Sequence, residues 1–371
     1  MIQRDMARLI GEYIDEGKII LVTGARQVGK TTALQEFCKG KKALTLNCDD
    51  LDDVQRLEGK TSTELRNLIA PYDIVLIDEA QRIRNIGLIL KQIGDLKMDT
   101  KVIATGSSSL DLANEIKEPA TGRLFEFSMH PLSLRELAAD TSEREEQRLL
   151  EQRMIYGLYP EAVTKPAIVK RTLNTLANNY LYKDILSYKG IKKPDLVVKL
   201  VRLLALQLGS EVSYNELSNS LGVDKETVEN YIGLLEKCFI VFRLESYSRN
   251  LRNEIKKGKK IYFYDNGIRN AVISNFAPLN MRNDCGQLWE NLMICERMKR
   301  HARQDELAQN YFWRTHDQKE IDLIEEEDGQ IRTFEFKWSA KKTPRQPRIF
   351  AETYPNSTFA LVTPDNYWEF V

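Results

Sequence analysis

The stretch that decides the fold of this chain reads Ile19-Ile20-Leu21-Val22-Thr23-Gly24-Ala25-Arg26-Gln27-Val28-Gly29-Lys30-Thr31-Thr32. It begins with a run of aliphatic residues, which is typical of a strand buried on both faces of a parallel sheet. The run ends at Gly24, where the complete Gly-x-x-x-x-Gly-Lys-Thr pattern of a phosphate-binding loop begins. An amphipathic helix is predicted directly after the loop, up to Cys38. A strand, a glycine loop and a helix in this order predict a site for a nucleotide phosphate.

Each residue type of the loop has a physical role. Gly24 and Gly29 let the backbone curl so that its N–H groups point toward phosphate oxygens. Lys30 supplies a positive charge for the β- and γ-phosphates, and Thr31 offers a hydroxyl ligand to Mg²⁺. The alternative is a glycine turn that only connects a strand with a helix. We expect ATP and Mg²⁺ as ligands, with residues 24–32 around the phosphates, and the sequence leaves a preference for ATP over GTP open.

A second apolar strand ends in two carboxylates. Its aliphatic residues 74–77 are followed by Asp78 and Glu79. The carboxyl ends of parallel strands meet at the edge of a sheet where ligands bind. We therefore expect Asp78 in the Mg²⁺ shell, and Glu79 is placed to polarise the water that attacks the γ-phosphate. The alternative is a strand that merely ends in an acidic surface turn.

Two further segments supply candidates for the same reaction. The strand after the acidic one ends in Thr105, Ser107 and Ser108, any of which can orient the attacking water. Ser109 is equally well explained as the cap of a following helix. Arg123 precedes a fifth strand and is a candidate arginine finger, a group that stabilises transferred charge, although a surface arginine is the alternative. An arginine finger stabilises the nucleotide bound by its own subunit or by a neighbouring subunit, so the oligomeric state stays open.

The composition narrows the class of protein. The chain has 371 residues, which favours two or three domains over one. Lys plus Arg and Asp plus Glu each number 54, so the balanced charge gives no general attraction to nucleic acid or to an anionic membrane. Five scattered cysteines, no signal peptide and no apolar run of about 20 residues predict a cytoplasmic protein without a membrane partner.

The middle of the chain carries two helical regions. Charged residues dominate 141–153, which is typical of a solvated helix or a linker. Residues 213–235 have the form of a helix-turn-helix with Gly222 in the turn, and strands expected at 239–244 and 260–264 complete a winged helix. Such modules bind DNA through the second helix or serve only for packing. Acidic side chains on the second helix repel phosphate and favour the packing role.

A predicted hairpin near the C-terminus gathers two carboxylates and a lysine. Glu335 and Lys337 alternate along one strand, so the period of two places these two on one face, a face that Asp322 of the adjacent hairpin strand is able to meet. Phe334, Phe336 and Trp338 belong to the other face, which should be buried. Two carboxylates and a lysine can bind Mg²⁺ and position a hydrolytic water. The alternative is a hairpin whose polar face meets solvent.

In order and spacing, these motifs resemble those of a prokaryotic group of AAA-superfamily ATPases. Beyond the loop, the acidic strand and the polar strand end, the resemblance includes Thr121-Gly122-Arg123, Pro131 to Glu136, Gly157 to Glu161 and Tyr180 to Ile185. The order Asp-x(n)-Glu-x-Lys is similar to that of restriction-endonuclease-like nucleases. In that comparison Glu290, on a preceding predicted helix, matches an additional acidic position. The candidate C-terminal site is therefore Glu290, Asp322, Glu335 and Lys337.

The resemblance covers nearly the whole chain and implies an α/β fold with four parts. These are a P-loop NTPase core with a five-stranded parallel sheet over 1–138, a helical lid or linker over 139–195, a winged helix over 196–265, and an α/β restriction-endonuclease-like domain over 266–371.

Two functions follow as hypotheses. The first is an Mg²⁺-dependent ATPase whose nucleotide cycle controls a C-terminal domain that cleaves or binds DNA or another nucleic acid, or that binds a protein partner. The second is a DNA- or protein-binding regulatory module that uses ATP only as a switch and carries an inactive nuclease fold.

Overall fold

The computed structural model describes residues 2–106, 120, 122–179, 193–248, 258–315, 317–339 and 344–371. The chain forms two compact units, one that holds Met1–Leu132 and one that holds Ser133–Glu236 and Ile240–Val371. Each unit contains its own sheet. None of the helices in these described ranges is long and apolar enough to cross a membrane.

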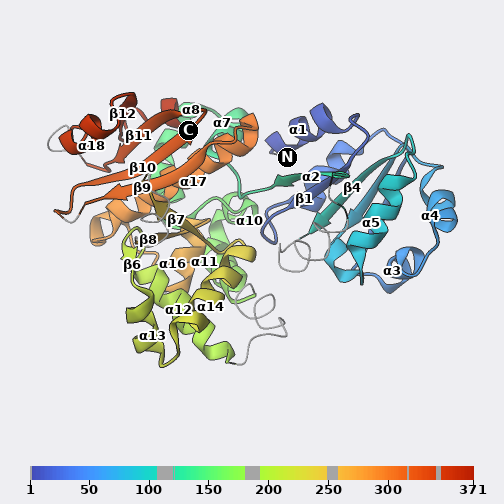
Figure 1. Ribbon diagram of the computed structural model, residues 1–371, viewed down its shortest axis with the longest axis horizontal. Coiled ribbons are helices and arrows are strands. Elements are labelled where there is room, and N and C mark those ends of the chain that lie inside the picture. Colours follow the sequence, from blue (N-terminus) through green and yellow to red (C-terminus); the bar gives the residue numbers. More distant parts are fainter. Residues whose placement is uncertain are drawn as a thin grey trace. The chain divides into compact units, whose positions relative to one another are not determined.

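The first unit is built on a five-stranded sheet (Figure 1). Its strands are β1 (Ile19–Thr23), β2 (Ala43–Asn47), β3 (Ile74–Asp78), β4 (Lys101–Gly106) and β5 (Leu124–Ser128). They lie in the order β2-β3-β4-β1-β5, and every pairing is parallel. The five-stranded parallel sheet predicted from the sequence is thereby confirmed. The order also places β4 between the loop strand β1 and the acidic strand β3.

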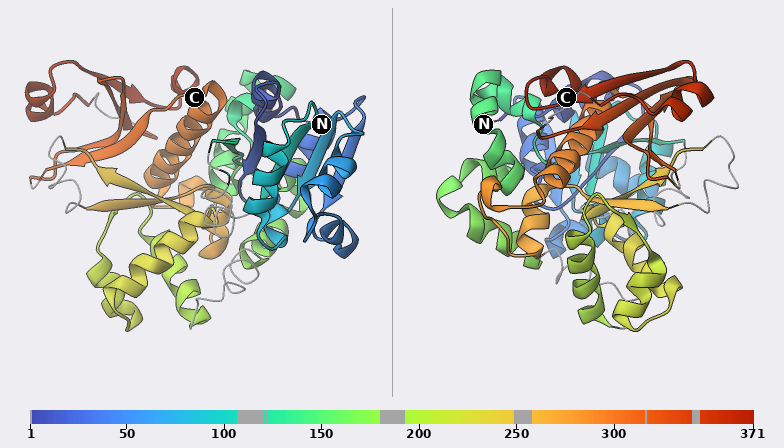
Figure 2. Two further views of the ribbon diagram at one scale, coloured as in Figure 1. Left: turned by 45° about the vertical axis from the view of Figure 1, so that its right-hand side comes forward. Right: turned by 90° about the vertical axis from the view of Figure 1, so that its left-hand side faces the viewer.

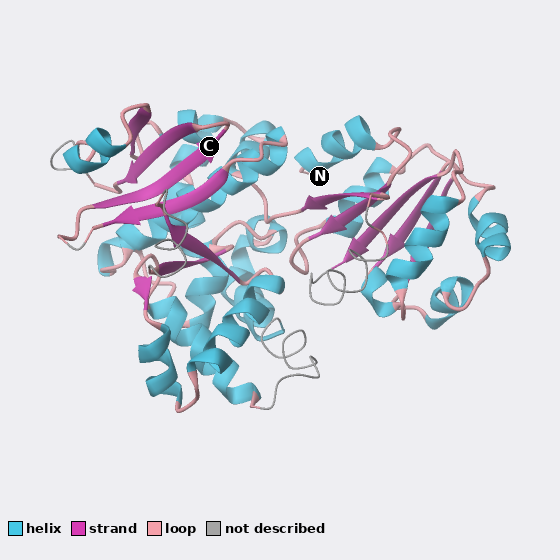
Figure 3. Cartoon of the chain, in the orientation of Figure 1, coloured by secondary structure: helices cyan, strands magenta, loops and turns pink. Residues whose placement is uncertain are grey.

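Helices accompany this sheet, as Figure 3 shows. Those of the first unit are α1 (Asp5–Tyr13), α2 (Lys30–Phe37), α3 (Leu51–Leu57), α4 (Ser62–Ile69) and α5 (Ile86–Asp95). Leu21 and Ile77 of the sheet belong to one apolar cluster with Leu65 of α4 and Leu90 of α5. Every residue of β1 and β3 is buried, as expected of central strands covered on both faces.

The second unit begins with helices. They are α7 (Leu134–Asp140), α8 (Glu143–Arg148), α9 (Leu150–Tyr156), α10 (Pro160–Thr164), α11 (Val169–Asn179) and α12 (Pro194–Leu206). The charged segment 141–153 forms α8 and most of α9, and most of its residues are exposed, as expected of a solvated helix. Glu146 is fully buried and accepts hydrogen bonds of 2.8 and 2.9 Å from Arg153. A buried ion pair therefore anchors a segment that the sequence presents as solvated.

The helix-turn-helix predicted from the sequence is present as α13 (Tyr214–Leu221) and α14 (Lys225–Lys237). The Ser213 side chain accepts a hydrogen bond from the backbone N–H of Glu216 and so caps α13. Gly222 ends α13 with φ +64°, and Asp224 accepts a hydrogen bond of 2.7 Å from the N–H of Thr227 at the start of α14. Two strands follow, β7 (Val241–Ser246) and β8 (Lys259–Phe263), which are antiparallel partners.

A single mixed sheet of seven strands runs through the second unit, in the order β12-β11-β10-β9-β7-β8-β6. The remaining strands are β6 (Glu211–Val212), β9 (Gln309–Arg314), β10 (Glu320–Glu327), β11 (Gln330–Phe336) and β12 (Ser357–Val362). The junction is a short parallel pairing in which Glu245 of β7 opposes Tyr311 of β9. The strands of the winged-helix segment therefore share one sheet with the C-terminal strands, a continuity that the sequence did not predict.

The other helices of the second unit are α16 (Asn266–Val272), α17 (Cys285–Gln304), α18 (Arg348–Thr353) and α19 (Tyr367–Phe370). The longest, α17, is the orange helix beside the C-terminal strands in Figure 2. It is tied to them by the indole N–H of Trp289, which donates to the carbonyl oxygen of Val362, and by a buried ion pair of Arg297 with Glu325. These contacts hold α17 against the sheet.

Candidate functional site

The phosphate loop follows β1 and is shaped by two glycines. Gly24 has φ +150°, and a Cβ there would lie 2.2 Å from the carbonyl oxygen of Met129, so a larger residue does not fit. Gly29 is the N-cap of α2 with φ +95°, a conformation that glycine adopts without strain. The backbone therefore turns sharply at both glycines. Among the other loop residues, Ala25 and Val28 are buried, Arg26 is half-buried, and Gln27 and Thr32 are exposed.

Lys30 begins α2 and points its ammonium group back into the loop. Its Nζ donates hydrogen bonds of 2.8 Å to the carbonyl oxygens of Gly24 and Ala25, and the residue is only 5% exposed. The hydroxyl of Thr31 donates a hydrogen bond of 2.8 Å to Oδ2 of Asp78. The structure thus joins the phosphate loop to the acidic end of β3.

The two acidic residues are linked through Thr105, at the carboxyl end of β4. The Thr105 hydroxyl donates to Oδ1 of Asp78 and accepts a hydrogen bond of 3.0 Å from the backbone N–H of Glu79. Glu79 has φ +52° and ψ +43°, an uncommon conformation for a residue with a side chain, and the Gln81 side chain donates to its carboxylate. Ser107 and Ser108, the other water-orienting candidates, lie outside the described residues.

Arg4 is a residue of this site that the sequence analysis did not single out. Its guanidinium donates to the carbonyl oxygen of Val28 in the loop and, at 2.7 Å, to that of His130 after β5. One side chain thereby ties the loop to a segment on the other side of β1. No pattern in the sequence marks Arg4, because its partners are backbone carbonyls. A hollow of about 400 Å³ beside it is lined by Ile2, Gln3, Arg4, Ala7, Ala33, Glu36 and Phe37.

Arg123 lies at the opposite edge of the sheet from the loop. Leu124, the first residue of β5, pairs in parallel with Ile19, the first residue of β1, whereas the loop leaves β1 after its last residue. One strand of five residues spans about 16 Å. The Arg123 guanidinium donates a hydrogen bond of 2.6 Å to Asp95. The structure therefore does not bring Arg123 to the phosphate loop of its own chain.

In the second unit, the three residues of the predicted C-terminal hairpin come together. Leu323 pairs with Phe334 in the antiparallel ladder of β10 and β11, so the adjacent residues Asp322 and Glu335 also oppose each other. The Nζ of Lys337 lies 2.6 Å from Oε1 of Glu335 and 3.9 Å from Oδ2 of Asp322. Both phenylalanines of β11 are buried on the other face, whereas Trp338, beyond the end of the strand, is only half-buried.

Glu290 of α17 joins this group together with residues that the sequence analysis missed. The Nζ of Lys260, on β8, lies 3.1 Å from Oε1 of Glu290, and Lys260 also pairs with Glu320 of β10. The Tyr262 hydroxyl donates to the same Glu290 oxygen. Lys260 belongs to a basic run that is typical of a surface loop, but it sits in a strand whose later residues are all buried. We call Lys260, Glu290, Glu320, Asp322, Glu335 and Lys337 the carboxylate cluster.

Burial and mutual charge alter the ionisation of the carboxylate cluster. Burial, and then the charge of Asp322, raise the pKa of Glu290 to about 7. Burial raises the pKa of Asp322 even though Lys260 favours its charged form, and burial together with Asp322 raises the pKa of Glu335. Burial alone would lower the pKa of Lys260, but Glu290 and its neighbours outweigh this effect and hold that pKa above its ordinary value. Lys260 therefore keeps its positive charge.

The carboxylate cluster does not fit the Mg²⁺ that the resemblance to nucleases implies. In the part of the chain that the structure describes, no group of three or more His, Cys, Asp or Glu side chains is arranged to hold a metal ion. The space between Glu290 and Glu320 is taken by the ammonium group of Lys260.

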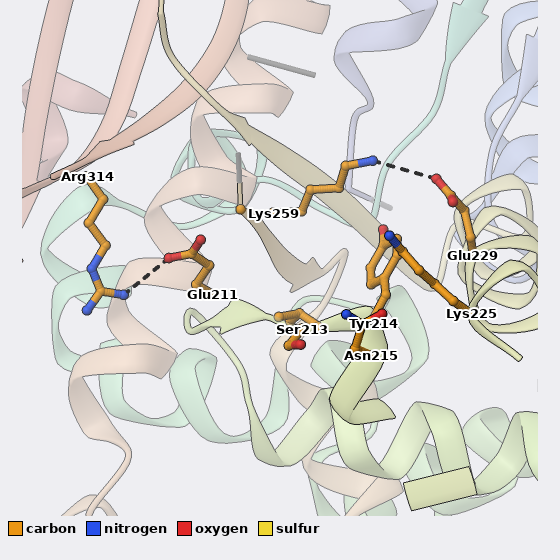
Figure 4. Close-up of a pocket in the computed structure, with 10 residues that line it drawn as sticks. Glu211, Ser213, Tyr214, Asn215, Lys225, Glu229, Lys259 and Arg314 are labelled. Atoms are coloured by element: carbon orange, nitrogen blue, oxygen red, sulfur yellow. Dashed lines mark ion pairs between the residues drawn. The ribbon is translucent and has the colours of Figure 1, made fainter. Parts of the chain in front are cut away.

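A polar hollow of about 690 Å³ lies where β6 and β8 meet the helix-turn-helix (Figure 4). Arg314 faces Glu211 across it at 3.6 Å, and Lys259 faces Glu229 at 3.8 Å. Arg314 also lies 3.8 Å from Glu320, so the hollow borders the carboxylate cluster. Because each of these cations faces a carboxylate, the pairs leave little net charge to attract phosphate.

Comparison with known protein families divides the chain into three regions. Residues 16–138 match the family model described as an AAA domain. Residues 147–279 and 285–366 match two models described as domains of unknown function, DUF8612 and DUF4143. The N-terminal region is therefore an AAA-type P-loop ATPase domain, and the two domains of unknown function follow it.

Two relatives and one solved structure extend this comparison. An uncharacterized protein of Mycobacterium tuberculosis is 25% identical over 346 residues, which cover 90% of this chain and 74% of the relative. An uncharacterized protein of Haemophilus influenzae is 24% identical over 346 residues, with coverage of 86% and 82%. A Walker-type ATPase of Pyrococcus abyssi is similar in fold, with a TM-score of 0.54 and 16% identity, over 74% of this chain and 96% of that one.

Proposed function

We propose that the first unit binds ATP with Mg²⁺ and hydrolyses it. The observation that carries this proposal is the hydrogen bond from Thr31 to Asp78, because it links the phosphate loop to the acidic strand end with both side chains ready to share one cation. The buried Lys30 in the same loop supports it. A glycine turn without a ligand role would need neither a buried lysine nor this link.

The residues of the site divide the chemistry among them. The loop N–H groups and Lys30 hold the phosphates, with the lysine exchanging its two carbonyl partners for phosphate oxygens. Thr31 and Asp78 hold Mg²⁺, which neutralises charge on the phosphates. Glu79 accepts a proton from the attacking water. The Thr105 hydroxyl orients Glu79 by accepting a hydrogen bond from the backbone N–H of Glu79. It orients Asp78 by donating a hydrogen bond to the carboxylate of Asp78.

A pair of variants tests this proposal. Lys30→Ala should abolish nucleotide binding, measured by fluorescence of a labelled ATP analogue, because the principal charge for the phosphates is lost. Glu79→Gln should still bind nucleotide but lose turnover by roughly 10²–10⁴-fold, the range typical of a lost general base. Lys39→Ala is the matched control, since that lysine lies just beyond the same helix with its side chain 69% exposed. Unchanged ATPase activity in both site variants would overturn the assignment.

We further propose that the nucleotide state of the first unit controls what the second unit binds. The carboxylate cluster favours a binding role over cleavage, because a lysine occupies the place of a metal ion. DNA or another nucleic acid is the first partner to test, since a helix-turn-helix lines the polar hollow that borders the cluster. Nucleic-acid affinity should then depend on bound nucleotide and fall steeply with salt. Absence of binding at low salt would exclude nucleic acid and leave a protein partner.

The switch alternative differs from the ATPase proposal in one measurable respect. A module that uses ATP only as a switch should bind it tightly and hydrolyse it negligibly, with or without single- or double-stranded DNA. Steady-state phosphate release in the presence of Mg²⁺ separates the two, because it requires turnover and not only binding.

A further inference from the structure

The ammonium group of Lys260 is the most deeply buried charge of the carboxylate cluster. The residue is only 2% exposed, and its Nζ, on β8, lies between Glu290 of α17 and Glu320 of β10. Asp322 adds its charge nearby. A buried cation is costly unless its surroundings compensate for it. The carboxylates of the cluster provide that compensation.

Two carboxylates flank this ammonium group. One belongs to Glu290 of the helix α17 and the other to Glu320 of the strand β10, so the negative charge on both sides is matched by the lysine. Mg²⁺ would need oxygen ligands at about 2.0–2.1 Å from its centre, and Lys260 Nζ stands 3.1 Å from the Glu290 oxygen. The ammonium group and a metal ion cannot occupy the same space, and the lysine is covalently held there.

We propose that Lys260 is a built-in cation that takes the place of a divalent metal ion and closes the carboxylate cluster to Mg²⁺ and Mn²⁺. The second unit consequently does not run metal-dependent phosphodiester hydrolysis. Its cluster serves as a fixed junction that joins β8, α17 and β10. This proposal concerns the second unit alone and is independent of ATP hydrolysis by the first.

Removal of the ammonium group should open the site. Lys260→Met keeps the apolar length of the side chain but leaves the carboxylates around it without their central cation. We expect this variant of the full-length, nucleotide-free protein to bind Mn²⁺ at least about tenfold more tightly than the unaltered protein, measured by electron paramagnetic resonance of free Mn²⁺. The double variant Lys260→Met with Asp322→Asn should lose that gain. Any Mn²⁺ that binds at the phosphate loop binds equally in all these proteins, so it does not affect the difference between them.

Lys259→Met is the matched control. This neighbour on the same strand faces the polar hollow of Figure 4 and lies 3.8 Å from Glu229 and Glu245. Because it takes no part in the carboxylate cluster, its loss should leave Mn²⁺ binding unchanged. A gain in Lys259→Met equal to that in Lys260→Met would mean that the effect is one of net charge, and the proposal would fail.

The unaltered protein provides a test that does not depend on folding of the Lys260 variant. Asp322→Asn should not change its Mn²⁺ binding, because the closed cluster takes up no Mn²⁺ and any binding by the phosphate loop is the same in both proteins. Saturable Mn²⁺ binding by the unaltered protein that disappears in Asp322→Asn would overturn the proposal. If Lys260→Met unfolds easily, Mn²⁺ should raise its unfolding midpoint by more than it raises that of the unaltered protein, and equal rises in the two proteins would equally count against a vacated cation site.

Discussion

The hydroxyl of Thr31 donates a hydrogen bond of 2.8 Å to Oδ2 of Asp78, a residue 47 positions further along the chain. The bond exists because β4 lies between β1 and β3 and all three strands run in parallel, so their carboxyl ends share one edge. Thr105, at the end of β4, donates to the other carboxylate oxygen of Asp78. One carboxylate thus gathers hydroxyl groups from two neighbouring elements.

The Thr31 hydroxyl should be required for Mg²⁺-dependent hydrolysis. Thr31→Val keeps the shape of the side chain and removes the oxygen, whereas Thr31→Ser keeps the oxygen. We expect Thr31→Val to lower the rate of ATP hydrolysis at saturating Mg²⁺ by more than the roughly 10–100-fold typical of residues that only support a metal ligand. Thr31→Ser should stay within a few-fold of the unaltered protein. Equal rates in the two variants would contradict a ligand role for this oxygen.

Arg4 should position the phosphate loop. Arg4→Ala removes hydrogen bonds from a charged group to the carbonyl oxygens of Val28 and His130, each worth about 1.5–3 kcal/mol. Because 1.4 kcal/mol corresponds to a factor of about ten, we expect nucleotide affinity to fall about tenfold or more, measured by titration calorimetry. Arg8→Ala is the control, since Arg8 pairs with Glu12 on the exposed side of α1. Comparable losses in both variants would show that the effect is not specific to the loop.

Any contribution of Arg123 to hydrolysis should depend on protein concentration. The strand register places it at the far edge of the sheet from its own phosphate loop, so it can only act on the loop of a neighbouring subunit. We expect the ATPase rate per subunit to rise with concentration, and Arg123→Ala should remove that rise. Arg66→Ala serves as the control. Arg66 is a different arginine of the first unit, and its guanidinium donates to the backbone carbonyl of Leu96. A concentration-independent deficit in Arg123→Ala would disagree with the register.

Glu325 should make the second unit sensitive to acid. Burial alone would raise its pKa, but His301, whose Nε2 lies 3.1 Å from Oε1 of Glu325, and the hydrogen-bonded guanidinium of Arg297 lower it to about 2. The unfolded chain binds this proton at about pH 4.3–4.5, so the contribution of Glu325 to stability is complete above that pH and is lost as the pH falls toward 2. The measurement is the free energy of unfolding by urea between pH 7 and pH 2.5.

Glu325→Gln isolates this effect. The variant leaves Arg297 buried without its charge partner, so we expect a loss of about 3–5 kcal/mol at neutral pH and a weaker decline on acidification. Glu352→Gln removes one partner of an exposed pair with Arg348 and should change stability by no more than about 0.5 kcal/mol. If the two variants have the same pH profile, Glu325 is not the group responsible.

Local patterns predicted much of the first unit and its site. One short stretch, residues 19–30, holds the aliphatic run of β1, the two glycines and Lys30. The conformation of this stretch follows from short-range sterics and from the need of a central strand to be buried. The helix-turn-helix was predictable for the same reason, because its caps and its Gly222 turn are local. Period-two alternation likewise predicted that Glu335 and Lys337 share a face, and the register of β10 with β11 brings Asp322 to it.

The tertiary structure decided what these patterns leave open. Arg123 stands next to a strand of the site in sequence, yet the parallel register puts it at the edge away from the loop. Lys260 looks like part of a basic surface run, yet the pairing of β7 with β9 carries its strand into a sheet with the C-terminal strands and buries its charge among their carboxylates. By itself the sequence determined the phosphate loop, because steric and burial constraints act over a few residues. Only the fold decided which charges meet, because the energy of a buried charge depends on neighbours that are distant in the chain.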